Sequence, residues 1–285
     1  MIYTIFLFSI LIILSKQQQI YLNQGNDWPG TCQEGSAQSP IDIKDVKGTC
    51  DNSMMVNMVL KAEDILTSVN KSLQGLKSVG QFTILHAKDI DGNLVGYDGY
   101  EIQVKSPSEH QIEGTQYDIE VQFYHNIKAE FKIANDAQQK TKAVVCIFFN
   151  QDSTKSSKFF DVWKPQKVEN SFNLNLNATL GEVFSTSDDY YSYQGSITQP
   201  PCDEVVNWYI FNTVFSMSTI QYSDISLYLQ RNIEFAKGNG SNRAIQSLND
   251  RVIKKGNIAC EEQFIYFFSF FILYIFINYF IFKLL

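Results

Sequence analysis

The side chains best suited to chemistry alternate along two short stretches. In the stretch EIQVK, Glu101, Gln103 and Lys105 share one face of an extended chain, and apolar residues share the other. In the stretch YDIEVQFYH, Glu120 and Gln122 also share a face. An antiparallel sheet often keeps one face in water, which is one interpretation of both patterns. If the two stretches pair as neighbouring strands, their polar side chains converge and could instead form the floor of a cleft.

The rest of the chain predicts the elements that would position these side chains. Extended runs occur at residues 82–87, 101–105, 117–125, 129–134, 143–149 and 206–211, separated by Gly, Asn, Asp and Pro. The clearest helical pattern covers residues 219–231, where Ser218 could cap the first turn. No linker or repeat interrupts residues 21–256. We therefore expect one large domain that is mainly β with a few short helices.

Composition limits the class of protein and of partner. The 285 residues are 45% hydrophobic and 14% aromatic, which allows a sizeable core. The net charge is −7, and no run of Lys or Arg stands beside an aromatic platform. This excludes a nucleic-acid partner from our expectations.

Both ends of the chain are apolar and predict a membrane-tethered, secreted domain. Residues 2–14 have the length of the apolar part of a secretory signal, so we assign residues 1–19 to a signal peptide. Residues 264–282 contain no charge and are long enough to span a bilayer. We expect a C-terminal transmembrane anchor there, with a GPI signal as the alternative. The domain between them, residues 20–258, is expected on the extracellular or luminal side of a cell-surface membrane.

A secretory route has consequences for Asn and Cys residues. N-linked glycosylation is predicted at three sequons, Asn70, Asn177 and Asn239. Five cysteines leave an odd one if disulfides form. Cys146 lies in the apolar run AVVCIFF and is expected to be a buried free thiol. Cys50 and Cys260 could form an internal bridge or pair between molecules, and the sequence leaves both open.

Five segments carry a resemblance to a known family. They are DWPGTCQEGSAQSPIDI (27–43), SPSEHQIEG (106–114), YDIEVQFYHN (117–126), YYSYQGSITQPPCDEVVNW (190–208) and NRAIQSLNDRVI (242–253). In their order and spacing they resemble the α-carbonic anhydrases, over about residues 21–255. The resemblance implies a single domain around a large, twisted, mostly antiparallel sheet with a conical active site. It also implies a disulfide between Cys32 and Cys202 and cis peptide bonds at Ser39-Pro40 and Pro200-Pro201.

The resemblance also implies a zinc site, but the ligands are replaced. Members of the family hold Zn²⁺ with three neutral histidines and attack CO₂ with the zinc-bound hydroxide. In this chain the three positions fall on Gln103, Lys105 and Gln122. An amide oxygen is a poor zinc ligand and Lys105 would have to lose its proton, so we expect no metal and no other cofactor. The position of the family's proton-transferring histidine falls on Gln81, whose amide cannot carry protons near neutral pH.

The chain's few histidines do not predict a relocated zinc site. They are His86, His110 and His125. The last two match histidines with structural hydrogen bonds in the family, and His86 has no carboxylate or cysteine at ligand spacing.

The resemblance implies that the surroundings of the lost metal are retained. Glu109 and Thr198 match the pair that orients the zinc-bound hydroxide, and Glu120 matches the carboxylate behind the third ligand. The positions of the pocket wall are Tyr124, Ile197, Gln199 and Trp208. Tyr124 is bulkier than the aliphatic residue usual in active members, so we expect a partly filled pocket.

Removing a dication from a site lined by two carboxylates leaves negative charge that needs compensation. We expect the Lys105 ammonium to lie near the zinc position, within hydrogen-bond reach of Glu120 or of the amide oxygens of Gln103 and Gln122. The alternative is that Lys105 extends up the cone to water.

Two classes of function follow from these replacements. The first is a catalytically silent domain with a binding or structural role, whose ligand could be a protein, a glycan or a small anion. The second is an active carbonate dehydratase with an atypical zinc site. The missing metal ligands favour the first.

Overall fold

The computed structural model describes residues 21–44, 56–72, 75–89, 91–167, 170–185, 189–231 and 236–257. The predicted signal peptide, the predicted membrane segment at residues 264–282, Cys50 and Cys260 lie outside these ranges. Each helix found inside them is too short or too polar to cross a lipid bilayer.

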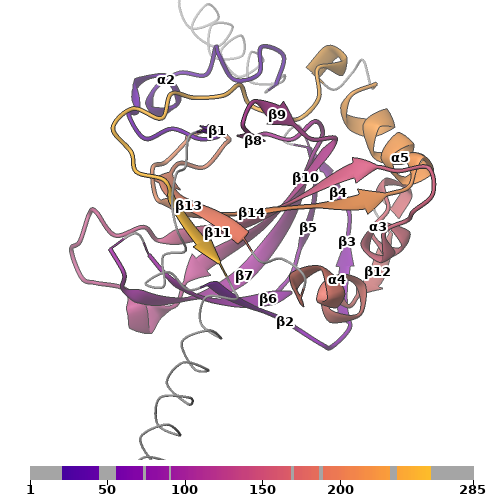
Figure 1. The fold of residues 1–285 in the computed structure, drawn as a ribbon, viewed down its shortest axis with the longest axis horizontal. Helices are drawn as coiled ribbons and strands as arrows, with labels where there is room; N and C mark the ends of the chain where they lie inside the picture. Colours follow the sequence, from indigo (N-terminus) through magenta and orange to yellow (C-terminus); the bar gives the residue numbers. More distant parts are fainter. Residues whose placement is uncertain are drawn as a thin grey trace, which may run out of the picture.

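A ten-stranded sheet forms the centre of the molecule (Figure 1). Eight strands follow the order β15-β13-β14-β11-β10-β7-β5-β4, and β6 pairs with both β7 and β2. The strands are β2 (Val56–Leu60), β4 (Asn70–Ser72), β5 (Gly75–Val79), β6 (Thr83–Lys88), β7 (Leu94–Lys105), β10 (Ile119–Ile127), β11 (Lys142–Gln151), β13 (Asp189–Gly195), β14 (Val206–Met217) and β15 (Lys254–Asn257). All pairs are antiparallel except β11 with β14. The predicted fold class, mainly β around a large, mostly antiparallel sheet, is confirmed.

Smaller elements surround this sheet. A three-stranded sheet contains β1 (Asp42–Ile43), β8 (Gln111–Ile112) and β9 (Thr115–Gln116), and β3 (Ile65–Ser68) pairs with β12 (Ser171–Leu174). The helices are α2 (Thr31–Glu34), α3 (Lys158–Val162), α4 (Leu176–Ser185) and α5 (Thr219–Leu229), with 3-10 turns η1 (Ala129–Phe131), η2 (Pro165–Lys167) and η3 (Ala236–Gly238). Figure 1 shows α3, α4 and α5 together at one side of the main sheet, away from α2 and the three-stranded sheet.

The predicted helix and its cap are present. Helix α5 begins after Ser218, whose hydroxyl accepts the Gln221 backbone N–H at 3.2 Å, while the Gln221 side chain accepts the Ser218 N–H at 2.9 Å. This reciprocal capping satisfies two backbone donors that the first turn leaves free. The helix ends at Leu229, two residues before the predicted limit.

The strand predicted at residues 129–134 is wrong. This segment contains the 3-10 turn η1 and then irregular chain. The pairing of β10 with β11 stops at Asn126 and Lys142, so the residues between them lie beyond the ladder. An alternating pattern without a partner strand has no backbone ladder to join, and the chain turns instead.

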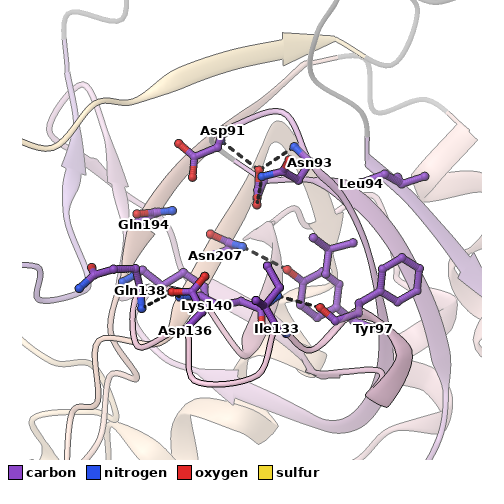
Figure 2. A pocket seen from close by; sticks show the side chains of 14 residues that line it. Asp91, Asn93, Leu94, Tyr97, Ile133, Asp136, Gln138, Lys140, Gln194 and Asn207 are labelled. Atoms are coloured by element: carbon purple, nitrogen blue, oxygen red, sulfur yellow. Dashed lines mark hydrogen bonds between the residues drawn. The ribbon is translucent and has the colours of Figure 1, made fainter.

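A cavity of about 270 Å³ lies beside this turn (Figure 2). Its walls come from the β6–β7 connection, the segment between β10 and β11, and the facing ends of β13 and β14. The lining includes Asp91, Tyr97, Gln194 and Asn207.

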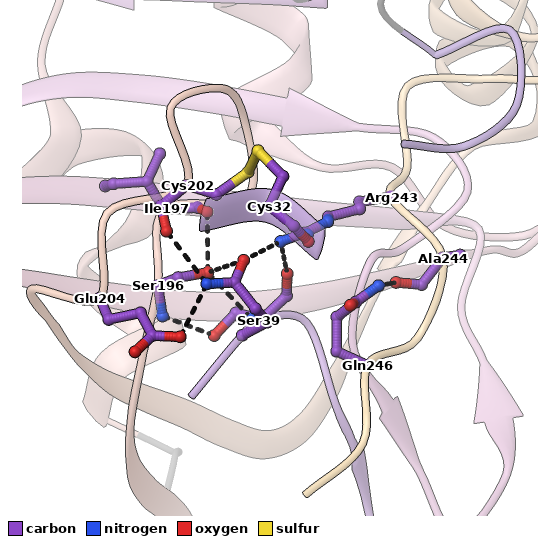
Figure 3. Close-up of a disulfide and its surroundings, with 10 residues drawn as sticks. Cys32, Ser39, Ser196, Ile197, Cys202, Glu204, Arg243, Ala244 and Gln246 are labelled. Carbon is purple, nitrogen blue, oxygen red and sulfur yellow. Dashed lines mark hydrogen bonds between the residues drawn. A yellow bond between two sulfur atoms is a disulfide. The ribbon is translucent and has the colours of Figure 1, made fainter. Parts of the chain in front are cut away.

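The predicted disulfide joins Cys32 to Cys202 (Figure 3). Arg243 packs beside it, and its guanidinium donates to the carbonyls of Cys32 at 2.6 Å and Ser39 at 2.7 Å. The peptide bonds Ser39-Pro40 and Pro200-Pro201 are cis, as the resemblance implies, and so is Ser106-Pro107. The crosslink therefore ties the start of the domain to the loop between β13 and β14.

Replacing Cys32 and Cys202 together by serine is expected to lower the free energy of unfolding by about 2–5 kcal/mol. The bridge joins residues 170 positions apart, so its loss restores much conformational freedom to the unfolded chain. Urea denaturation measures the change. Reductant should bring the wild type to the variant's stability and leave the variant unaffected, whereas equal stability of the oxidised wild type and the variant would contradict the prediction.

Candidate functional site

Strands β7 and β10 bring the predicted polar residues together. Their antiparallel register places Gln103 opposite Gln122 and Lys105 opposite Glu120. All four side chains are buried, with Gln103 the most exposed at 6%. The interpretation of these patterns as a solvated sheet face is therefore wrong, and the polar face is interior.

The opposite faces of the same strands explain why this register is fixed. Ile102, Val104, Val121 and Phe123 belong to the main hydrophobic core. A slip of one residue would move these apolar side chains to the polar face, so the core determines which residues meet at the site.

Lys105 is fully buried and forms the centre of the site. Its ammonium donates to the Tyr21 hydroxyl at 2.8 Å and lies 3.5 Å from the Glu109 carboxylate. Burial alone would lower its pKa, but the charge of Glu109 and the Tyr21 hydroxyl raise the pKa above its usual value. The ammonium therefore stays protonated, and the alternative in which Lys105 reaches water is wrong.

The partners of Lys105 differ from the predicted ones. We expected Glu120 or the amide oxygens of Gln103 and Gln122, and the structure gives Glu109 and Tyr21. The reason is that the oxygens of Glu120 already accept hydrogen bonds from other groups, as described below. Tyr21 comes from the first described residues and was not predicted, because no pattern in the sequence marks it.

Glu109 collects donors from four parts of the chain. One carboxylate oxygen faces Lys105 and accepts the Arg243 backbone N–H at 3.0 Å. The other accepts the Thr198 hydroxyl at 2.6 Å and the Gln122 amide at 2.9 Å. The predicted pairing of Glu109 with Thr198 is thus present in the geometry.

Glu120 is held by a separate set of donors. One oxygen accepts the backbone N–H groups of Glu109 and His110 at 2.8 Å, and the other accepts the Gln122 amide at 2.7 Å and lies 2.9 Å from His110 Nδ1. Burial alone would raise the pKa of Glu120, but the His110 ring and these hydrogen bonds lower it to about 2. Glu120 is therefore a carboxylate at neutral pH.

The two glutamines link the centre of the site to its wall and to the surface. The Gln122 oxygen accepts the Tyr124 hydroxyl at 2.9 Å. The Gln103 oxygen accepts the Gln199 amide at 2.7 Å, while its nitrogen donates to Glu101 at 2.6 Å. Each carboxamide is therefore engaged at both its donor and its acceptor.

The predicted wall residues lie around this network. Tyr124 and Trp208 are buried with ring centroids 6.5 Å apart, and half-buried Ile197 packs against the same apolar cluster. Gln81 is exposed in the connection between β5 and β6 and is outside the network. The three sequon asparagines, Asn70, Asn177 and Asn239, are exposed.

The histidines have the structural roles that we predicted for two of them. The ring of His110 lies between Glu120 and the Tyr193 hydroxyl, which is 2.7 Å from Nε2. His125 Nε2 is 2.8 Å from the Thr83 hydroxyl, and burial lowers the pKa of His125 to about 4. His86 lies on β6 and is partly exposed.

The donors at the three predicted metal positions do not fit zinc. They are two amides with hydrogen-bonded oxygens and one ammonium, and none offers the imidazole or thiolate that Zn²⁺ prefers. Within the part of the chain that the structure describes, one other group of donor atoms, from His110, Glu120 and Cys146, lies within 4.8 Å of one another.

This second group was missed because Cys146 is distant from the histidine in sequence. Cys146 lies on β11, the strand next to β10, which carries Glu120. It is buried as a free thiol, as predicted. All three residues are 0% exposed, and both Glu120 oxygens and both His110 nitrogens already have partners. The group therefore forms a closed hydrogen-bonded cluster with no open position for a reacting water.

Comparisons with known proteins agree with the fold. A halotolerant carbonic anhydrase from Dunaliella salina superposes with a TM-score of 0.62 at 22% identity, covering 83% of this chain and 97% of that one. A crystal structure of dioscorin complexed with ascorbate gives a TM-score of 0.62 at 24% identity, covering 84% and 98%. In sequence, a carbonic anhydrase of Pectobacterium carotovorum is 24% identical over 224 residues, 78% of this chain and 81% of its own. Dioscorin DB3S of Dioscorea polystachya is 28% identical over 210 residues, which cover 70% of this chain and 71% of its own.

The match to a family extends over nearly all of the described chain. The sequence model for the eukaryotic-type carbonic anhydrases matches residues 23–257. This span includes both strands of the site, the disulfide and the segment that supplies Arg243. The chain therefore belongs to the eukaryotic-type carbonic anhydrase family.

Proposed function

We propose that this carbonic-anhydrase-like domain does not hydrate CO₂ and has a binding or structural role. The observation that carries the proposal is the donor set at the three metal positions. Gln103, Lys105 and Gln122 converge there, and an ammonium between two engaged amides cannot act as a zinc ligand. Without the metal, the site lacks the hydroxide nucleophile that hydration requires.

The electrostatics of the site support the same proposal. In an active member, a dication would neutralise the carboxylates around it. Here the Lys105 ammonium lies 3.5 Å from Glu109, and Glu120 is compensated on the other side by His110 and backbone donors. Lys105 supplies a positive charge beside Glu109, so zinc binding there would have to displace a protonated lysine.

We also propose that the domain is held at a cell-surface membrane with its sheet on the extracellular or luminal side. The apolar segments at residues 1–19 and 264–282 support this topology. A disulfide between Cys32 and Cys202 suits an oxidising compartment.

Replacing Lys105 by methionine is expected to lower the free energy of unfolding by about 3–5 kcal/mol, because it leaves the buried Glu109 without its cation. The double variant Lys105→Met/Glu109→Gln should recover most of this loss, since it removes both charges. Lys255→Met is the control. Its ion pair with Asp189 is partly exposed, and its loss should change stability by about 1 kcal/mol or less. Chemical denaturation measures the wild type, these three variants and Glu109→Gln alone, and additive effects of the two site substitutions would contradict the proposed charge compensation.

Zinc content and CO₂ hydration, measured on the same purified protein, test the function directly. The wild type is expected to hold far less than one equivalent of zinc and to show no hydration above the uncatalysed rate. The matched variant Gln103→His/Lys105→His/Gln122→His is expected to bind one equivalent, since Glu120 and the Glu109–Thr198 pair remain in place.

Two results would contradict the proposal. Stoichiometric zinc in the wild type, with hydration, would support the alternative of an active carbonate dehydratase with an atypical site. A triple-histidine variant that folds but does not bind zinc would show that these three residues do not occupy the metal positions.

A further inference from the structure

The cavity beside the β6–β7 connection is separate from the Lys105 network. Along β14, Trp208 packs against the His110 ring, with centroids 4.7 Å apart, on the side of the network. The preceding residue, Asn207, points to the other side of the sheet and donates to the Tyr97 hydroxyl at 3.1 Å. Asn207 and Tyr97 are buried at the base of the cavity (Figure 2).

We propose that this cavity binds a saccharide. Its lining contains several polar groups that the folded chain leaves unused. Among the described residues, no hydrogen bond uses the Asn207 amide oxygen, the Gln194 carboxamide or the Asp91 carboxylate. Asn207 is only 3% exposed and lines the cavity. Its oxygen is not among the fully buried atoms that lack a partner, so it is open to solvent in the cavity, where a ligand hydroxyl can take the place of water.

The chemistry of the lining selects hydroxyl groups. A sugar hydroxyl both donates and accepts, and it is best met where carboxylate or amide oxygens stand beside amide nitrogens. Asp91 supplies acceptors only, whereas Gln194 and Asn93 supply both kinds of group. The ring of Phe131, which is partly exposed, and the exposed side chain of Ile133 provide apolar surface for the C–H groups of a sugar ring.

The size of the cavity agrees with one sugar unit. Sites for drug-sized molecules measure about 300–1,000 Å³, and this cavity measures about 270 Å³. Asp91 in the β6–β7 connection and Leu94 at the start of β7 are lining residues that are exposed at the surface, so a terminal unit of a longer glycan can reach the cavity.

A metal ion does not account for the same lining. Asp89, Asp91 and Asp136 all contribute to it, but across the described ranges the only group of His, Cys, Asp and Glu donors within 4.8 Å is the buried one at His110. Asp89 accepts the backbone N–H groups of Asp91 and Asn93, which stabilises the turn. Asp136 accepts backbone N–H groups in its own turn in the same way.

The charge of the cavity restricts the class of sugar. Three aspartates and one lysine line it, and the Lys140 ammonium already donates to the Glu204 carbonyl at 2.8 Å. The remaining field is negative and should disfavour a carboxylated sugar. The ligand is therefore a neutral sugar.

Saturation-transfer NMR on the purified full-length chain tests this inference. The probes are the methyl glycosides of glucose, galactose, mannose and N-acetylglucosamine, together with methyl glucuronide. At least one neutral probe should receive saturation, and the glucuronide should bind more weakly than the glucoside. Asp91→Ala and Gln194→Ala should each weaken the responding probe about threefold to tenfold, as expected for one lost hydrogen bond. The control Asp250→Ala changes an exposed carboxylate elsewhere and should leave binding unchanged.

Several results would overturn the inference. They are no transfer to any probe, binding that persists in the Asp91→Ala/Gln194→Ala double variant, and equal binding of the glucuronide. A rise in melting temperature with Ca²⁺ alone, lost in Asp91→Ala, would assign the cavity to a metal. Because the cavity lies across the sheet from Lys105, failure here leaves the zinc measurements unaffected, and the two proposals are tested separately.

Discussion

The buried ion pair between Lys105 and Glu109 is the interaction on which the rest of the site depends. A carboxylate that is 1% exposed is stable only if its charge and lone pairs are compensated. Lys105 supplies the charge, and Thr198, Gln122 and the Arg243 backbone supply hydrogen bonds. These donors come from β7, β10, the loop before β14 and the segment after η3, so one carboxylate fixes four parts of the chain.

The two buried glutamates are stabilised in different ways. Glu120 relies on backbone N–H groups and on His110. Glu109 relies on Lys105, which stands at one of the three predicted metal positions, for its positive partner. The Tyr21 hydroxyl completes the surroundings of the ammonium, which connects the first described residues to the site. Every carboxylate oxygen of the two glutamates therefore has a hydrogen-bond or ion-pair partner inside the protein.

Much of this arrangement follows from the sequence, because local alternation and the hydrophobic core leave few choices. The polar faces of residues 101–105 and 119–124 predict their convergence once the two strands pair, and the register confirms it. The capping of α5 by Ser218 is a local effect and was also predictable. The disulfide of Cys32 with Cys202 followed from the family resemblance alone.

The parts that were missed depend on contacts between distant segments. Tyr21 is 84 residues from Lys105 and belongs to no periodic pattern. Cys146 reads as an apolar core residue, and only the pairing of β11 with β10 places it beside Glu120. Residues 129–134 have the alternating pattern of a strand but no partner strand, so they form a 3-10 turn and irregular chain instead. The cavity near Asn207 combines four separate connections and strand ends, a combination that alternation along one strand cannot reveal.

Anomalous X-ray diffraction at the zinc absorption edge, from crystals grown with excess zinc, shows whether a metal binds between β7 and β10. We expect no anomalous peak between Gln103, Lys105 and Gln122, with electron density for the Lys105 ammonium between Tyr21 and Glu109. A zinc peak at that position, with Lys105 displaced toward solvent, would show that the domain holds a metal there.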